Sequence, residues 1–244
     1  MQSLENKVVV VTGASRGIGA AIVKAFAKEG ANIVLTARDR ARLKKSADES
    51  GLSKPRYHIV TADITKHSGV KKIIGQALKK FGRIDIFVNN AGVGVHKSLL
   101  ETTEKEYDGM FDTNMKAVFF SFLEVIPIMK KQKGGQIINI SSAAGLRGEP
   151  MIAVYASTKA ALNALSEGVA REIRNDEIKI SVLAPASVAT DFSSNFIGKK
   201  KPNPASKAKK KLSVDEVAQA VVAMAKDNPN AWTSLSVLRP LSVK

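Results

Sequence analysis

The chain has 244 residues, which is long enough to bury a sizeable core as one large domain or two small ones. It has no cysteine, which excludes disulfides and thiolate metal sites, and we predict no metal site. A net charge of +16 favours anionic partners such as phosphorylated ligands, a membrane surface or nucleic acid. Specific nucleic-acid binding is not expected, because the sequence has neither zinc-finger spacing nor an aromatic-rich RNA-binding signature.

Strands and helices alternate along the chain. Short β-branched apolar runs predict strands, and apolar residues at helical spacing predict helices. Repeated βαβ units of this kind form an α/β fold, a doubly wound parallel sheet with helices on both faces. In chain order the predicted elements are strand 7–13, helix 18–30, strand 32–38, helix 39–50, strand 57–63, helix 67–81, strand 84–92, helix 103–131, strand 136–142, a helix carrying Tyr155 to about Arg174, strand 178–185, helix 214–226 and strand 234–240.

The chain gives no sign of a second domain, of export or of membrane insertion. We see no linker before residue 193 and therefore expect one domain over residues 1–244. The N-terminal stretch MQSLENKVVVVTG lacks the apolar core of a signal peptide. The longest apolar run, 117–129, is interrupted by Glu124 and is shorter than the roughly 20 residues of a membrane helix. We expect a cytoplasmic protein without a membrane span.

The stretch TGASRGIG, residues 12–19, joins the first strand to the first helix. Its glycines, Gly13, Gly17 and Gly19, allow a tight turn and a close approach of the backbone to a phosphate. The start of the helix offers free N–H groups to a pyrophosphate. The spacing is G-x-x-x-G-x-G, and such a glycine set is weak evidence alone. Between a strand and a helix, however, it predicts a dinucleotide site at the carboxyl edge of the sheet.

The end of the second strand bears on the choice of cofactor. An acidic residue in this region would bind the ribose hydroxyls of NAD, but Ala37 and Arg38 end the strand here. The Arg38 guanidinium is available to pair with a 2′-phosphate, and Arg16 in the glycine turn could form a second contact. Either arginine alone could be a surface charge. Together, and without an acid at the strand end, they favour NADP(H) as the cofactor.

Tyr155 and Lys159 lie four residues apart in VYASTKAAL, which places them on one face of a helix. An ordinary tyrosine has a pKa of about 10, and a neighbouring cation lowers it toward the range useful for acid–base catalysis. Ser142 ends the fifth strand, where its hydroxyl could meet the phenol at one substrate oxygen. The pair alone would more often be a packed ring beside a solvated amine.

Taken together, these motifs give the chain a family resemblance over nearly its whole length. It resembles the short-chain dehydrogenases/reductases, through TGASRGIG at 12–19, NNAG at 89–92, Asn114 in DTNMKAVFF, Ser142 in INISS and YASTK at 155–159. The resemblance implies a single-domain Rossmann-like fold of about seven strands. It also implies an oxidoreductase that transfers hydride between a nicotinamide and a carbonyl or alcohol substrate.

The resemblance assigns roles to four catalytic residues. Tyr155 would donate the proton in carbonyl reduction, and Ser142 would hold the substrate oxygen. Lys159 would bind the nicotinamide ribose and tune Tyr155, while Asn114 would anchor a water that leads protons to the lysine. Asp63 would contact the adenine. The complete set of expected cofactor-binding residues is Gly13, Ser15, Arg16, Gly17, Ile18, Gly19, Arg38, Asp63, Asn90, Ala91, Gly92, Tyr155, Lys159, Pro185, Val188 and Thr190.

Two departures from the family pattern matter. Pro185 is followed by Ala186, where the family usually has glycine, so a turn that needs positive φ would be less comfortable. The C-terminal SLSVLRPLSVK lacks the glycine pair of typical 3-oxoacyl-carrier-protein reductases, which weakens that specific assignment. We expect an NADPH-dependent carbonyl reductase. The alternatives are a 3-oxoacyl thioester reductase specifically and a non-catalytic NADP(H)-binding sensor or scaffold.

Two segments suggest partners. Residues 191–212 are expected to form a substrate lid, and the lysines of Lys199–Lys211 could attract an anionic substrate or carrier, although a solvated loop has the same composition. The helix at 114–129 is apolar almost all round, whereas a monomer needs one apolar stripe. We therefore expect a homotetramer or dimer, with the small residues Ala160, Ala161 and Ala164 of the Tyr155 helix sharing the interface.

Overall fold

A computed structural model describes residues 2–190, 211–228 and 230–241. Within them, seven strands form one parallel sheet in the order β3-β2-β1-β4-β5-β6-β7, so the predicted α/β sheet is confirmed. The strands are β1 Val8–Thr12, β2 Asn32–Ala37, β3 Tyr57–Thr61, β4 Ile86–Asn89, β5 Gly135–Ile140, β6 Ile178–Pro185 and β7 Leu235–Leu238. The helices are α1 Gly17–Lys28, α2 Arg40–Glu49, α3 His67–Phe81, α4 Glu104–Phe111, α5 Ala117–Lys131, α6 Ala153–Glu172 and α7 Val214–Ala225.

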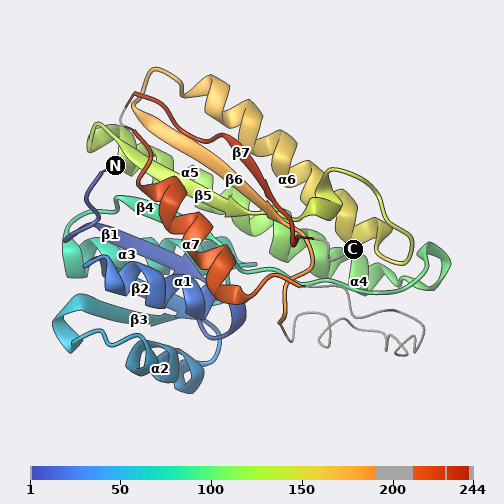
Figure 1. Ribbon diagram of the computed structural model, residues 1–244, viewed down its shortest axis with the longest axis horizontal. Helices are drawn as coiled ribbons and strands as arrows, with labels where there is room; N and C mark the ends of the chain where they lie inside the picture. The colour runs from blue at the N-terminus through green and yellow to red at the C-terminus, as the bar shows by residue number, and fades with distance from the viewer. Residues whose placement is uncertain (1, 191–210, 229, 242–244) are drawn as a thin grey trace.

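The helices cover both faces of the sheet (Figure 1). Side chains alternate between the faces along each strand. In β1, Val9 and Val11 pack in a core with residues of α1, α2 and α7, whereas Val10 packs on the other side with residues of α3, α5 and α6. Because both faces are buried, each central strand reads as a continuous apolar run, which is why the sequence predicted the strands well.

The strand order reverses between β1 and β4. From β1 the chain moves outward through β2 and β3, and from β4 it moves the other way toward β7. The two strands are in direct register, with Val9 opposite Ile86. At such a switch point the connections leave in opposite directions and open a crevice at the carboxyl ends of the strands. The glycine turn after β1 and the NNAG turn after β4 therefore meet.

The helix predicted over 103–131 is one region with an interruption. A π-helical turn, Asp112–Lys116, separates α4 from α5. Such a turn contains one residue more than an α-helical turn and is often found at functional sites. Here it holds Asn114, which is buried. Its residues, DTNMK, include no glycine or proline that would mark an interruption of the helix, so the turn could not be predicted from the sequence.

The apolar surface of α5 is smaller than predicted. Five apolar side chains of this helix, Ala117, Val118, Phe122, Val125 and Met129, are buried. Phe120, Ile126 and Ile128 are half-buried, while Phe119 and Leu123 remain 46% and 47% exposed. On α6, which covers the same face of the sheet, Ala160 and Ala164 are exposed and Ala161 is half-buried. The exposed apolar face thus reduces to a short strip on α5 beside small residues on α6.

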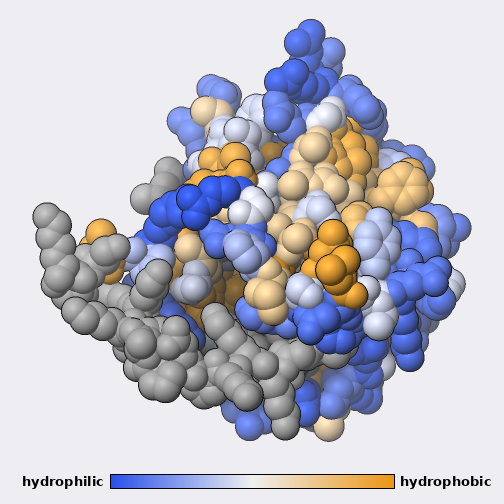
Figure 2. Space-filling model, turned by 90° about the vertical axis from the view of Figure 1, so that its right-hand side faces the viewer, coloured by the Kyte–Doolittle hydropathy of each residue, from blue (hydrophilic) through white to orange (hydrophobic). Residues whose placement is uncertain are grey.

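The carboxyl ends of the strands point to one end of the molecule, on the right in Figure 1 and toward the viewer in Figure 2. Hydrophobic side chains gather on that end, bordered by hydrophilic ones. Of the predicted lid, residues 191–210 lie outside the described residues. Among the helices that the structure describes, none is long and apolar enough to cross a membrane.

Candidate functional site

The glycine turn after β1 is packed too closely for side chains. Gly13 has a φ of +66°, and a Cβ there would lie 2.9 Å from the Ala91 Cα. A Cβ on Gly19 would lie 2.2 Å from the Gly13 carbonyl oxygen. Both positions therefore require glycine, the first for its conformation and contact, the second for contact alone.

Hydrogen bonds connect the glycine turn after β1 to the turn after β4. The Thr12 hydroxyl accepts from the backbone N–H groups of Asn90 and Ala91, at 3.0 and 3.1 Å. The Asn90 side-chain amide donates back to the Thr12 carbonyl at 2.9 Å. Thr12 was not among the predicted site residues, although it begins the glycine motif. Through it, Asn90 and Ala91 are held against the predicted dinucleotide turn.

Helix α1 begins at this turn with its first N–H groups open to an anion. Arg16 precedes the helix in an extended conformation, and within the described residues no side chain caps it. Arg16 and Gly17 are exposed, while Ser15 and Ile18 are half-buried. The uncapped N–H groups and the positive end of the helix dipole suit a pyrophosphate.

The segment after β6 lies beside the glycine turn that follows β1. Val188 pairs with Leu212 in a parallel bridge. Thr190 lies close to the glycine turn, since a Cβ on Gly17 would be 3.8 Å from its methyl group. Ala186, which follows Pro185, is outside the positive-φ residues, and its N–H donates to the Leu238 carbonyl at 2.8 Å. The expectation of an uncomfortable turn at Ala186 is therefore wrong, because strand-like pairing with β7 fixes it in a conformation open to any residue.

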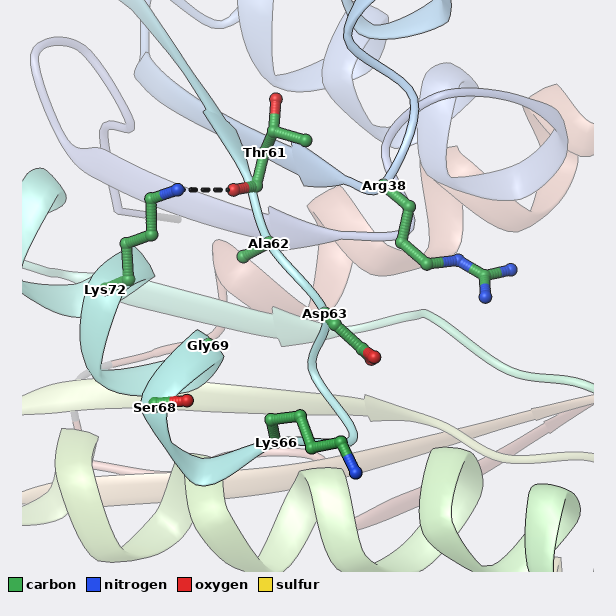
Figure 3. Close-up of a pocket in the computed structure, with 8 residues that line it drawn as sticks. All are labelled: Arg38, Thr61, Ala62, Asp63, Lys66, Ser68, Gly69 and Lys72. Carbon is green, nitrogen blue, oxygen red and sulfur yellow. Dashed lines mark hydrogen bonds between the residues drawn. The ribbon is translucent and has the colours of Figure 1, made fainter.

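A hollow of about 540 Å³ lies at the ends of β2 and β3, lined by Arg38, Thr61, Ala62, Asp63, Lys66, Ser68, Gly69 and Lys72. The side chains of Arg38, Asp63 and Lys66 point to the same side, whereas Lys72 lies on the other side and donates to the Thr61 carbonyl at 2.9 Å (Figure 3). The Thr65 N–H and hydroxyl, with the charges of Arg38 and Lys66, lower the pKa of the Asp63 carboxyl. Asp63 therefore stays an ionised acceptor between two cations.

Ser142, Tyr155 and Lys159 converge at the carboxyl end of β5. Tyr155 lies in the first turn of α6 and is only 8% exposed, and a hydrogen bond joins its phenol to the Ser142 hydroxyl. Lys159 follows one turn later and is 4% exposed. Its ammonium donates to the Ile140 carbonyl at 2.9 Å and lies 5.9 Å from the centre of the Tyr155 ring. The three side chains predicted to be catalytic thus share one buried corner.

Asn114 connects this corner to the loop after β4. Its side-chain oxygen accepts from the Val93 N–H, and its amide donates to the Val93 carbonyl, both at 2.9 Å. The amide also donates to the Thr158 hydroxyl at 3.0 Å, which donates to the Tyr155 carbonyl at 2.7 Å. The side chain of Asn114 is therefore engaged in positioning, and the predicted water contact remains a proposal.

Besides Thr12, two supporting residues were missed by the sequence analysis. Thr158 lies inside the YASTK motif, but its bond to Asn114 depends on the π-helical turn. Asn163, one turn beyond Lys159, accepts from the Ser141 hydroxyl at 2.6 Å and donates to the Gly145 carbonyl at 3.2 Å. It thereby holds the turn that carries Ser142. A helical asparagine spaced from Lys159 by one turn is the only signal that the sequence offers for it.

Burial determines the protonation states of Tyr155 and Lys159. It raises the pKa of Tyr155 to about 12, although the hydrogen bond to Ser142 acts in the opposite direction. It lowers the pKa of Lys159 to about 8. The expected net lowering of the Tyr155 pKa is not found, because burial of the phenol favours its neutral form and is the largest influence on its pKa. At neutral pH Tyr155 is a protonated phenol, the form that donates a proton.

The comparisons with known proteins agree with this geometry. The family described as short chain dehydrogenase matches residues 7–201. The chain belongs to this family. It is 34% identical, over 99% of both chains, to an uncharacterized oxidoreductase of Staphylococcus saprophyticus. It is therefore an oxidoreductase of the short-chain dehydrogenase family with a site for a nicotinamide cofactor.

Solved structures extend the comparison. A metagenomic short-chain oxidoreductase in complex with NADP is 32% identical, with a TM-score of 0.83 over 98% of this chain and 99% of that one. An alcohol dehydrogenase from the archaeon Thermococcus sibiricus, complexed with 5-hydroxy-NADP, is 32% identical, with a TM-score of 0.84 over 96% of both chains. A 3-ketoacyl-(acyl-carrier-protein) reductase from Brucella melitensis, complexed with NADH, is 28% identical, with a TM-score of 0.86 over 97% of both chains.

The buried ammonium of Lys159 gives a testable pH dependence of stability. Its pKa falls from 10.5 to about 8 on folding, so between these values the unfolded chain holds more protons on this side chain than the folded one. The free energy of unfolding then rises with pH. We expect the native protein to gain stability relative to Lys159→Met between about pH 8 and pH 9.5, below the range where Tyr155 titrates. Denaturant unfolding of both proteins at each pH measures this, and parallel curves would contradict it.

Proposed function

We propose that the protein is an NADPH-dependent oxidoreductase that reduces a carbonyl group or, in reverse, oxidises the alcohol. The observation that carries the proposal is the hydrogen-bonded pair of Ser142 and Tyr155 beside the buried Lys159. Two hydroxyls that meet at one point can hold a single substrate oxygen. The nicotinamide supplies the hydride when it is bound.

The chain's own residues bind the oxygen and move the proton. Ser142 and Tyr155 donate hydrogen bonds to the carbonyl oxygen, which polarises the C=O bond. As the carbonyl carbon accepts a hydride, Tyr155 gives its proton to the oxygen, and the alcohol forms. Solvent returns a proton to the phenolate, which the neighbouring Lys159 ammonium stabilises while it exists. Asn114 keeps α6 and the loop after β4 in the positions that this transfer needs.

NADPH is preferred over NADH in this proposal because cations surround the end of β2. Arg38 and Lys66 flank Asp63, and Arg16 is exposed in the glycine turn. A 2′-phosphate placed there would gain charge-assisted hydrogen bonds. Two of the structural relatives hold NADP or a derivative of it, and another holds NADH, so the preference has to be measured on this protein.

Two alternatives remain. A 3-oxoacyl thioester reductase is favoured by the similarity to the Brucella melitensis protein, but the C-terminal sequence departs from that type. A non-catalytic sensor or scaffold would bind NADP(H) without needing Ser142, Tyr155 and Lys159 in one corner. Turnover of any carbonyl substrate that depends on Tyr155 separates the enzyme from the sensor.

Replacing Tyr155 and replacing Lys159 are expected to affect turnover and cofactor binding differently. Tyr155→Phe removes only the phenolic oxygen, so turnover should fall by about 10²–10⁴-fold, as for other general acids, while cofactor binding survives. Lys159→Met should lower turnover and also weaken cofactor binding, since its ammonium would serve both ribose and phenol. NADPH fluorescence titration and steady-state kinetics on folded variants measure both effects.

The matched control is Tyr107→Phe, because Tyr107 lies on α4 and is 46% exposed. This variant should keep full activity. Substantial turnover in folded Tyr155→Phe would refute the proposed proton donor, and unchanged activity in both Tyr155→Phe and Lys159→Met would favour the sensor.

The preference for NADPH should depend on Arg38. A charge-assisted hydrogen bond contributes roughly 1.5–3 kcal/mol, so two arginines at the 2′-phosphate can supply a preference of about 100-fold or more. Replacing Ala37 by Asp and Arg38 by Leu together should shift the ratio of kcat/KM values toward NADH. Equal kcat/KM for the two cofactors in the unaltered protein would refute the role of Arg38.

Self-association should occur through α5 and α6. Burial of Phe119 and Leu123 against a second copy would remove exposed apolar surface, and Ala160 and Ala164 would let the helices approach closely. We expect light scattering at micromolar concentration to give a dimer or tetramer, and Phe119→Glu with Leu123→Glu to reduce the mass. A clean monomer in the unaltered protein would disprove the assembly.

A further inference from the structure

Three large apolar side chains are exposed on the two loops that flank the Ser142–Tyr155 pair. Val93 is 39% exposed, Leu146 is 44% exposed and Met151 is 40% exposed. Val93 follows the NNAG turn after β4, and the other two lie between Ser142 and α6. We name these three residues the apolar rim. Exposed leucine or valine is ordinary when isolated, but a set beside a reactive pair suggests a binding surface.

The backbone of the rim is held in place from several sides. Both backbone groups of Val93 are hydrogen-bonded to Asn114. The Lys97 N–H donates to the Met151 carbonyl at 2.8 Å, which ties the loop after β4 to the loop after β5. The Lys97 ammonium in turn pairs with Glu106 on α4 at 2.6 Å. These bonds fix the spacing of Val93 and Met151 before any ligand arrives.

Leu146 is fixed through its neighbour Gly145. A Cβ on Gly145 would lie 2.7 Å from the Lys159 carbonyl carbon, so the loop lies directly on α6. Asn163 also donates to the Gly145 carbonyl at 3.2 Å. Leu146, which follows Gly145, therefore has little freedom to move away from α6.

Met151 has an unfavourable backbone conformation. Its φ is +67°, a region that glycine and asparagine adopt readily and that other residues adopt at a cost of order 1 kcal/mol or more. A glycine or asparagine would make the same turn with less strain. A long apolar side chain therefore stands at a strained and exposed position.

The surface behind the rim is apolar as well. Val95, Met110 and the Tyr155 ring form a buried cluster, against which Ala144, Ile152 and Val154 pack. This end of the molecule shows hydrophobic side chains together (Figure 2). Nearby charged side chains form ion pairs: Arg147 lies 3.0 Å from Glu149, and Lys97 lies 2.6 Å from Glu106. A substrate carboxylate would therefore compete with a carboxylate already in place.

We propose that the apolar rim selects carbonyl substrates whose substituent is an uncharged aryl or cyclic hydrocarbon group. The inference rests on the proposed function, because the rim has meaning for catalysis only if Ser142 and Tyr155 hold the carbonyl oxygen. The oxygen binds at the hydroxyl pair, and the hydrocarbon group displaces water from Val93, Leu146 and Met151. Such an arrangement of few polar groups and an apolar lining is usual for small-molecule sites.

The test compares matched carbonyl compounds. Acetophenone and cyclohexanone are the uncharged probes, 4-acetylbenzoate adds a carboxylate to the same aryl ketone, and acetoacetyl-N-acetylcysteamine represents the 3-oxoacyl thioesters. With saturating NADPH, kcat/KM for acetophenone should exceed that for 4-acetylbenzoate by about 10-fold or more. Turnover of the polar or charged probes alone would overturn the inference and leave the proposed function standing. A lack of turnover with every probe would contradict both.

The decisive variant is Met151→Asn, which tolerates positive φ and therefore preserves the turn. It should lower kcat/KM for acetophenone by about 10-fold, mainly through KM, with unchanged NADPH affinity and equal or higher stability. The matched control is Leu100→Asn, at a leucine that is 97% exposed. An equal loss in the control, or unchanged acetophenone kinetics in folded Met151→Asn, would refute the role of the rim. A fall in light-scattering mass without a kinetic change would assign Met151 to an interface between copies instead.

Discussion

One buried interaction fixes the geometry of the site: the Lys159 ammonium donates to the Ile140 carbonyl at 2.9 Å. An ammonium withdrawn from water is costly unless it is hydrogen-bonded, and this bond joins α6 to the last residue of β5. Ser142 follows two residues after Ile140, and Tyr155 precedes Lys159 by one helical turn. The position of the helix on the strand therefore sets the distance between the two hydroxyls. Gly145 adds to the constraint, since the loop touches the Lys159 backbone where a Cβ would not fit.

The reversal of strand order brings this corner next to the dinucleotide turn. The Thr12 hydroxyl and the Asn90 amide join the connections that follow β1 and β4. Gly92, two residues further, lies so close to the corner that a Cβ there would be 3.6 Å from the Lys159 ammonium. A cofactor that binds along the carboxyl edge would therefore run from the hollow at Arg38 and Asp63, past the glycine turn, to Lys159. The order of contacts follows from sheet topology rather than from any single motif.

The sequence predicted the strands and most helices because the parallel sheet is buried on both faces and its apolar runs are continuous. The motifs also indicated which residues gather at the carboxyl edge. The π-helical turn at Asn114 could not be predicted, since its residues, DTNMK, include no glycine or proline that would mark an interruption of the helix. The pairing of Ala186 with Leu238 and the bond of Asn163 to Gly145 depend on contacts between distant segments. The pKa of Tyr155 was expected in the wrong direction because the sequence shows neighbouring charges but not the extent of burial.

Several features of the site oppose stability. A buried ammonium, a phenol withdrawn from water and a methionine at a φ of +67° each cost free energy that a simpler surface would avoid. They lie together around the end of β5, while the continuous apolar cores on both faces of the sheet carry the stability of the fold. This separation lets unfavourable groups persist where rigid strands and helices hold them. A strained residue at the rim and a protonated phenol behind it are consistent with a surface shaped for a ligand rather than for folding alone.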